Sequence, residues 1–386
     1  MREPTDATTR SARRIGVALL AMAVTAAASG AVTAASAAPA KQGGAVLARA
    51  GHVGTRADVP WARIGSGWTL ATWSASGRAR ATLFLIDARG NRYAITRLAK
   101  RTAPLLWSPD GKRVLVSGPH HLMQVTLRTG AAHRVNVPEG QVVTYSRPKG
   151  LALIEAVDVP HGQFLVPRLE RFGTDGQHQL TYPKSIKRAG VLDTNSVLET
   201  ADGAQLVVGA RHGLVLLRNN GTLVRRLHAT SARCMVASWW RKDVALAQCG
   251  NGALWAVPIS GAHDRRLTES TSKEDPFGYS DAWRYTRGRL GLAPNGCGPE
   301  SLVRFTPQGH GNRIDVPSPT GHVGRSSYIG HHGNLVDMLF VADRGCQAGK
   351  TVLFAYNAVK RTSTALLGPT VNGGSVISAI PYAADK

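Results

Sequence analysis

Short apolar runs alternate with polar turns along most of the chain, and one unit of this pattern recurs seven times. The unit is an apolar strand, a turn rich in Gly or Asn, and a second strand that ends in a basic or aliphatic residue. Runs of this length, bounded by turn residues, are typical of β-hairpins. The seven copies are Thr82–Leu98, His121–Val137, Arg168–Tyr182, Leu214–Leu227, Ala253–Leu267, Ser301–Val316 and Thr351–Leu367.

The spacing of the turns indicates a repeat architecture. Six of the turns contain a glycine, and these are Gly90, Gly130, Gly176, Gly221, Gly261 and Gly309. They lie 40 to 48 residues apart, a period that suits a four-stranded propeller blade and not a helical repeat. The sequence therefore predicts an all-β fold, a β-propeller of seven four-stranded blades. Each recurring hairpin then supplies the two outer strands, c and d, of one blade.

The pattern also predicts how the ring closes and where its longer loops lie. Segment Ser375–Tyr382 is a strand with no partner at its own end of the chain. We expect it to join the blade that contains Trp68–Trp73 and Thr82–Leu98, because this hides two sheet edges. Lys184–Ser196 and Glu269–Ser280 are expected to be loops between blades.

The N-terminal 37 residues have the composition of a secretory signal peptide. Basic residues precede the apolar run Ile15–Ala28, and Ala35–Ala37 fits an A-x-A cleavage site. We expect residues 1–37 to be removed, 38–58 to be a flexible leader and 59–386 to form one propeller domain, with no membrane span left. The mature protein would be secreted or held in the cell envelope. Arg13-Arg14 leaves open whether export uses the general or the twin-arginine route.

Positive charge dominates the composition. The formal net charge is +23, and removal of residues 1–37, with four Arg and two acidic residues, leaves +21. Such a charge attracts anionic partners by long-range steering. Arginine is scattered over every repeat, however, and this is also the pattern of an evenly solvated surface. The expected partner is a protein or an anionic envelope polymer and not nucleic acid, because the chain has no recognised nucleic-acid module. We expect a monomer.

The four cysteines of an exported chain are expected to form disulfides. Cys234 and Cys249 flank a segment with a polar turn at its centre, so a hairpin would place them opposite each other. Cys297 and Cys346 precede equivalent strands of consecutive repeats. Four cysteines allow three connectivities, of which we favour Cys234–Cys249 with Cys297–Cys346. The chain has neither a C-x-x-C motif nor a paired His spacing beside them, so no metal or other cofactor is predicted.

One segment carries a family resemblance. Trp107, Ser108, Pro109, Asp110 and Gly111, followed by Lys112, form a tight turn between two apolar strands. This segment resembles the WSPDGK signature of WD40-like (PD40-type) repeats in TolB-type β-propellers, and the resemblance implies an exported TolB-like β-propeller protein. Weaker copies lie at Tyr145–Gly150, Thr200–Gly203 and Trp239–Asp243. TolB also has an α/β domain and a six-bladed propeller, which this chain does not match, so the partners of TolB are not carried over.

Histidines supply the candidate ligand-binding residues. His120, His121, His161 and His212 fall in the predicted loops between strands b and c of three successive blades. On one face of the ring they would bind a ligand or change charge near pH 6.5. The simpler interpretation is that His fills polar turn positions in loops too far apart to share one ion. His331-His332 falls in a turn near the opposite face.

The sequence favours binding over catalysis. It contains no G-x-S-x-G motif and no room for a second α/β domain, which argues against a prolyl-peptidase-like enzyme, and no catalytic residue is predicted. Trp239, Trp240, Trp255 and Trp283 are more typical of a blade core than of sugar stacking. We therefore expect a binding or scaffold module for a protein or an anionic envelope ligand, on the face formed by the d–a and b–c loops. The alternatives are a purely structural envelope protein and a hydrolase or lyase at the central channel. The enzyme would need acidic residues or His that converge at one mouth.

Overall fold

The computed structural model describes residues 51–382, apart from gaps at 76–77, 119–120, 138–140, 162–163, 191, 229, 231, 272–276, 296–297, 320–323, 343–349 and 369–373. The chain divides into two units, Met1–Gly43 and Gly44–Lys386, and every described residue belongs to the second. The predicted signal peptide and most of the predicted leader thus lie outside the described residues.

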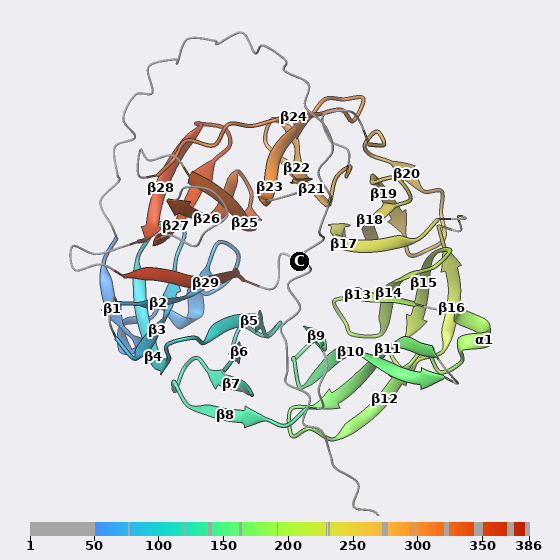
Figure 1. Cartoon of the computed structure of the whole chain (residues 1–386), viewed down its shortest axis with the longest axis horizontal. Coiled ribbons are helices and arrows are strands. Elements are labelled where there is room, and N and C mark those ends of the chain that lie inside the picture. The colour runs from blue at the N-terminus through green and yellow to red at the C-terminus, as the bar shows by residue number, and fades with distance from the viewer. Residues whose placement is uncertain are drawn as a thin grey trace, which may run out of the picture. The chain divides into compact units, whose positions relative to one another are not determined.

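Seven β-sheets form the blades of a β-propeller, with one strand of each sheet near the centre of the ring (Figure 1). Six sheets have four strands and one has five. The predicted all-β, seven-bladed propeller is confirmed. The helices among the described residues are η1 (Arg56–Asp58), η2 (Trp61–Arg63) and α1 (Ile186–Ala189), and none is long and apolar enough to span a membrane.

Each of blades 2 to 7 is one four-stranded meander, whose strands follow one another from the centre outward. Blades 2 to 4 are β5 (Ala103–Trp107), β6 (Arg113–Ser117), β7 (Leu122–Thr126) and β8 (Ala132–Val135); β9 (Gln141–Tyr145), β10 (Ala152–His161), β11 (Phe164–Gly173) and β12 (His178–Tyr182); and β13 (Leu192–Glu199), β14 (Gln205–Ala210), β15 (Gly213–Arg218) and β16 (Leu223–Leu227). Blades 5 to 7 are β17 (Cys234–Arg241), β18 (Val244–Cys249), β19 (Ala253–Pro258) and β20 (Arg265–Arg266); β21 (Asp281–Tyr285), β22 (Gly288–Asn295), β23 (Gly298–Phe305) and β24 (Gly311–Arg313); and β25 (Gly324–His332), β26 (Leu335–Ala342), β27 (Lys350–Asn357) and β28 (Thr362–Leu367).

Blade 1 joins the two ends of the described chain. The C-terminal strand β29 (Ser375–Pro381) pairs antiparallel with β2 (Thr69–Ser74) and takes the innermost position, inside β2, β3 (Arg80–Ile86) and β4 (Arg92–Ala99). The predicted closure of the ring is confirmed. A short strand, β1 (Val53–Thr55), adds a parallel partner on the outer edge, at β4. The last residues of the predicted leader thus form β1 and η1.

The core lies between the blades. Among the described residues, seven clusters of buried side chains each draw on two neighbouring blades, so that every interface in the ring has one. The middle strands are buried on both faces, as in β14 and β15, and therefore read as continuous apolar runs. The outer strands, such as β16, carry exposed arginines.

The turn between the first and second strands of a blade follows from its sequence. In blade 2 the hydroxyl of Ser108 donates to Oδ1 of Asp110 at 2.6 Å, and Gly111 takes a positive φ of 71°. In blade 4 Thr200 donates to Oδ1 of Asp202 at 2.6 Å, and Gly203 has a φ of 73°. The degenerate copy of the WSPDGK segment therefore builds the same turn.

The prediction that Lys184–Ser196 forms a loop is wrong in part. This segment contains helix α1 and the first residues of strand β13. The polar residues at the start of β13 interrupt the apolar pattern by which a buried strand is predicted from sequence. Asp193 nevertheless lies in the interior at 4% exposure, where it is paired with Arg233. Only a partner from the next blade makes a polar residue suitable for that position.

A buried hydrogen bond ties blade 1 to blade 7. Thr69 on β2 donates from Oγ1 to Oδ2 of Asp337 on β26 at 2.8 Å. Asp337 is 2% exposed, and burial raises its pKa above the ordinary value, against the lowering effects of nearby His332 and the Thr69 hydroxyl. The bond thus stabilises a polar group at the interface where the ring closes.

Substitution of Thr69 tests this tie. Thr69→Val keeps the side-chain shape but leaves the carboxyl of Asp337 without its donor, so we expect a loss of about 1–3 kcal/mol in the free energy of unfolding, measured with urea. Thr72→Val is the matched control, because Thr72 is fully buried on the same strand and its hydroxyl makes no hydrogen bond within the described chain. Equal effects of the two substitutions would contradict the assignment.

Candidate functional site

Two adjoining pockets lie between the innermost strands of blades 5, 6 and 7. The larger, of about 270 Å³, is lined chiefly from the ends of β17, β21 and β25. The smaller, of about 120 Å³, also reaches Pro381 of β29. Ser238 and His331 line both, and we call the two together the central pocket. Its main lining side chains are Ser238, Trp239, Trp240, Asp281, Trp283, Arg284, Tyr328, His331 and His332.

Stacked rings form one wall of the central pocket. The rings of Trp283 and His331 are nearly parallel, at 11°, with their centroids 4.3 Å apart. The ring centroid of Tyr328 is 5.4 Å from that of Trp283, and the Tyr328 hydroxyl is 2.7 Å from Nδ1 of His331. Three rings from two blades are thereby held in one fixed group.

A cation and a second indole also line the pocket. The guanidinium of Arg284, on an exposed side chain, lies 5.3 Å from the ring centre of Trp240, a cation–π contact that links β21 to β17. Trp239, the neighbour of Trp240 on β17, is half-buried and packs against the cluster between blades 4 and 5. The pocket lining therefore combines aromatic rings with a positive charge.

Polar groups occupy the deeper part. Ser238 donates from its hydroxyl to Oδ1 of Asp281 at 2.9 Å, and the backbone N–H of Ala282 donates to the same oxygen at 2.8 Å. Two buried nitrogens, Nε1 of Trp283 and Nε2 of His332, make no hydrogen bond within the described residues. Polar side chains thus line the pocket together with the aromatic rings.

The sequence interpretation found only part of this site. Trp240 and Trp283 are 8% and 5% exposed, in agreement with the predicted blade core, but they also line the pocket. Arg284, Tyr328 and His331 were not selected as ligand-binding residues. One signal was available, since aromatic residues and His recur just before the first turn of three successive repeats, at Trp239-Trp240, Trp283 and His331-His332.

The predicted histidines lie elsewhere. His121, His161 and His212 are at the connections between the second and third strands of blades 2, 3 and 4, whereas His331-His332 is at the connection between the first and second strands of blade 7. His120 and the side chain of His161 lie outside the described residues. The described residues contain one group of three side chains close enough to share a metal, and none of these histidines belongs to it. A ligand site at these loops stays a prediction.

One predicted disulfide is confirmed. Cys234 and Cys249 are bonded and lie directly opposite each other on β17 and β18, with their Cα atoms 4.2 Å apart. The bridge joins the two inner strands of blade 5, as the hairpin pattern predicts. Cys297 and Cys346 lie outside the described residues.

Two buried glutamates lie outside the central pocket. Glu155 on β10 is fully buried opposite Glu170 on β11, and burial, with the charge of Glu170, raises its pKa to about 7. Neither of its oxygens makes a hydrogen bond in the described structure. Burial also raises the pKa of Glu199 to about 7, although this carboxylate accepts from the backbone N–H of Arg147. These groups affect stability and not the chemistry of the pocket.

Comparison with known proteins gives likenesses of structure alone. No family model and no curated protein matches the chain. Among solved structures, TolB from Acinetobacter baumannii is 14% identical over 81% of this chain and 67% of its own, with a TM-score of 0.42. A structure described as TolB from Agrobacterium tumefaciens is 10% identical over 83% of this chain and 98% of its own, with a TM-score of 0.39.

A longer enzyme also appears among the matches. A puromycin-hydrolyzing peptidase of Mycobacterium tuberculosis is 14% identical over 82% of this chain and 56% of its own, with a TM-score of 0.45. The matched structures thus include two described as TolB, the group that the WSPDGK segment resembles. At such identities and TM-scores, none of these matches assigns an activity, a ligand or a partner.

The pKa of Glu155 predicts a pH-dependent stability. The carboxyl of Glu155 keeps its proton in the folded state up to a pH of about 7, whereas in the unfolded chain it loses the proton at its ordinary pKa of 4.5. The free energy of unfolding therefore falls as the pH rises from about 4.5 to about 7. Glu155→Gln removes this loss. We expect the variant to be more stable than wild type by up to about 3 kcal/mol at pH 8 and equal to it near pH 4, by urea unfolding.

Glu269→Gln is the control, because Glu269 is exposed. The same pH-dependent gain in this variant, or none in Glu155→Gln, would show that Glu155 does not carry the effect.

Proposed function

We propose that this propeller is an exported binding module whose ligand is an anionic saccharide of the cell envelope, held in the central pocket. The observation that carries the proposal is the meeting of stacked aromatic rings, Arg284 and two histidines in one hollow at the centre of the ring. The signal-like N-terminus and the disulfide support an oxidising location outside the cytoplasm.

The chemistry of the pocket suits a sugar. A pyranose has apolar C–H faces, which pack on aromatic rings, and hydroxyl groups at its edge, which need polar partners. The stacked rings of Trp283 and His331 supply aromatic surface, while Ser238 and Tyr328 supply hydroxyls. A pocket of about 270 Å³ takes one or two sugar units.

The charge selects an anionic sugar. The guanidinium of Arg284 is at the mouth, and a planar guanidinium binds carboxylate or phosphate through two parallel hydrogen bonds. The net charge of +21 that remains after residues 1–37 are removed also raises the local concentration of an anionic polymer. A protein partner, the other expectation from the sequence, suits a broad surface rather than this small concave site.

A second candidate is catalysis on the same class of ligand. The smaller cavity gathers Ser238, Asp281, Tyr328 and His331, and the Tyr328 hydroxyl is hydrogen bonded to the His331 ring. These are groups that serve as general acids and bases. A hydrolase or lyase acting here would convert a bound saccharide to shorter products.

Arg284→Gln tests the binding proposal. We expect titration calorimetry with two probes, alginate oligosaccharides for carboxylate and glycerol teichoic acid for phosphate, to show saturable binding of at least one by wild type. Loss of the bidentate charge contact should weaken it about tenfold or more. The matched control is Arg134→Gln, because Arg134 is exposed on β8 of blade 2 and its loss changes the net charge equally.

The outcomes separate the models. Equal weakening by both substitutions would show that only the overall charge attracts the polymer. No binding of either probe would overturn the proposal, and binding of neutral dextran with equal affinity would overturn its anionic part. New reducing ends or unsaturated products during incubation, lost in Tyr328→Phe, would favour the enzyme.

A further inference from the structure

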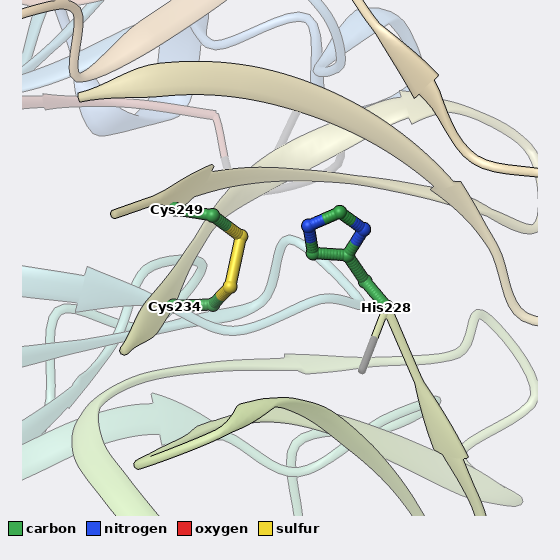
Figure 2. A group of neighbouring side chains, drawn as sticks. All are labelled: His228, Cys234 and Cys249. Carbon is green, nitrogen blue, oxygen red and sulfur yellow. A yellow bond between two sulfur atoms is a disulfide. The ribbon is translucent and has the colours of Figure 1, made fainter. Parts of the chain in front are cut away.

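His228 lies against the disulfide of blade 5. One nitrogen of its ring and both sulfurs of Cys234 and Cys249 lie within 4.8 Å of one another. Figure 2 shows the edge of the imidazole turned toward the S–S bond, with one nitrogen on that side and the other directed away. In the described part of the chain, this is the one group of three such side chains with metal-binding proximity.

A carboxylate and an indole hold the imidazole in this position. Nδ1 of His228 is 2.5 Å from Oδ2 of Asp264, so the ring nitrogen left to face the sulfurs is Nε2. Trp255 packs on the ring with its centroid 4.5 Å away. A carboxylate on the far nitrogen is the usual support of a metal-binding histidine, because it fixes the tautomer and raises the basicity of the ligating nitrogen.

The surroundings are those of a protected metal site. Cys234 is fully buried and Cys249 is 6% exposed, while the side chain of His228 is 11% exposed. The two cysteines lie on paired strands. A hydrogen bond from the N–H of Gly213, at the start of β15, to the carbonyl of Ala232 anchors the chain between His228 and Cys234 to blade 4. The three side chains are therefore held together by the blade itself and not by the S–S bond alone.

We propose that His228, Cys234 and Cys249 form a zinc site when the disulfide is reduced, with Asp264 as the supporting carboxylate. A dithiol reductant supplies two electrons and two protons, which break the S–S bond and give two thiols, and the reductant becomes a disulfide. Zn²⁺ then displaces both thiol protons and binds two thiolates and Nε2 of His228, with water as the fourth ligand. Zinc and the disulfide exclude each other, so blade 5 has two alternative cross-links.

The test uses metal titration of the reduced protein. Because reduction would also free Cys297 and Cys346, the background protein carries Cys297→Ser and Cys346→Ser. After reduction under argon, we expect one Zn²⁺ per chain with a dissociation constant below about 1 μM. Co²⁺ should give a thiolate-to-metal charge-transfer band. The oxidised protein should bind neither metal at this site.

Substitutions identify the ligands. His228→Ala should weaken Zn²⁺ binding by at least about tenfold, and Asp264→Asn by about 10- to 100-fold. His178→Ala, an exposed histidine of blade 3, should leave binding unchanged. If the reduced protein unfolds without metal, the readout is recovery of β-sheet circular dichroism on adding Zn²⁺, in the background protein and not in His228→Ala.

Three results would overturn the proposal. They are no stoichiometric binding or refolding after reduction, equal affinity in His228→Ala, and equal binding by oxidised and reduced protein. The last would place the metal elsewhere on the chain. The proposal does not depend on the saccharide site, because its readouts involve blade 5 and metal alone.

Discussion

Face-to-face burial between neighbouring blades is the interaction on which the rest of the structure depends. A four-stranded blade has two apolar faces and cannot bury either by itself, so each interface needs the next blade. The seven clusters of buried residues occupy these interfaces, one for each pair of neighbours. Strand β29, paired with β2, contributes Val376 and Ala379 to the interface between blades 7 and 1, where the ring closes.

The same constraint determines where polar groups are tolerated. Asp337, Asp193 and Glu199 are all nearly buried, and each is contacted by a donor from an adjacent blade, namely Thr69, Arg233 and the backbone of Arg147. Glu155 differs because it faces another carboxylate on its own blade. Buried polar pairs across the interfaces fix which blades are neighbours. Glu155 makes no such pair, so its burial lowers the stability of its own blade.

The packing of neighbouring blades also creates the two proposed sites. The innermost strands of blades 5, 6 and 7 converge at the centre, so Trp240 and His331, far apart in sequence, line one pocket. His228 follows the outer strand β16 of blade 4 and lies against the disulfide between β17 and β18, the two inner strands of blade 5. Neither site needs a loop insertion or a second domain, because both are made from the repeat.

The sequence by itself determined the repeat, the number of blades, the closing strand and the Cys234–Cys249 pair. Each rests on local chemistry, namely turn glycines, period-two or continuous apolar runs, and two cysteines at matched distances from one turn. The tertiary structure alone decided that Asp193 opens a strand, that Arg284 and His331 share a pocket, and that His228 faces the disulfide. These facts depend on the rotation from one blade to the next, which places side chains of different repeats together. The recurrence of aromatic residues and His before the first turn marks equivalent positions in the repeats, but it does not show which side chains meet.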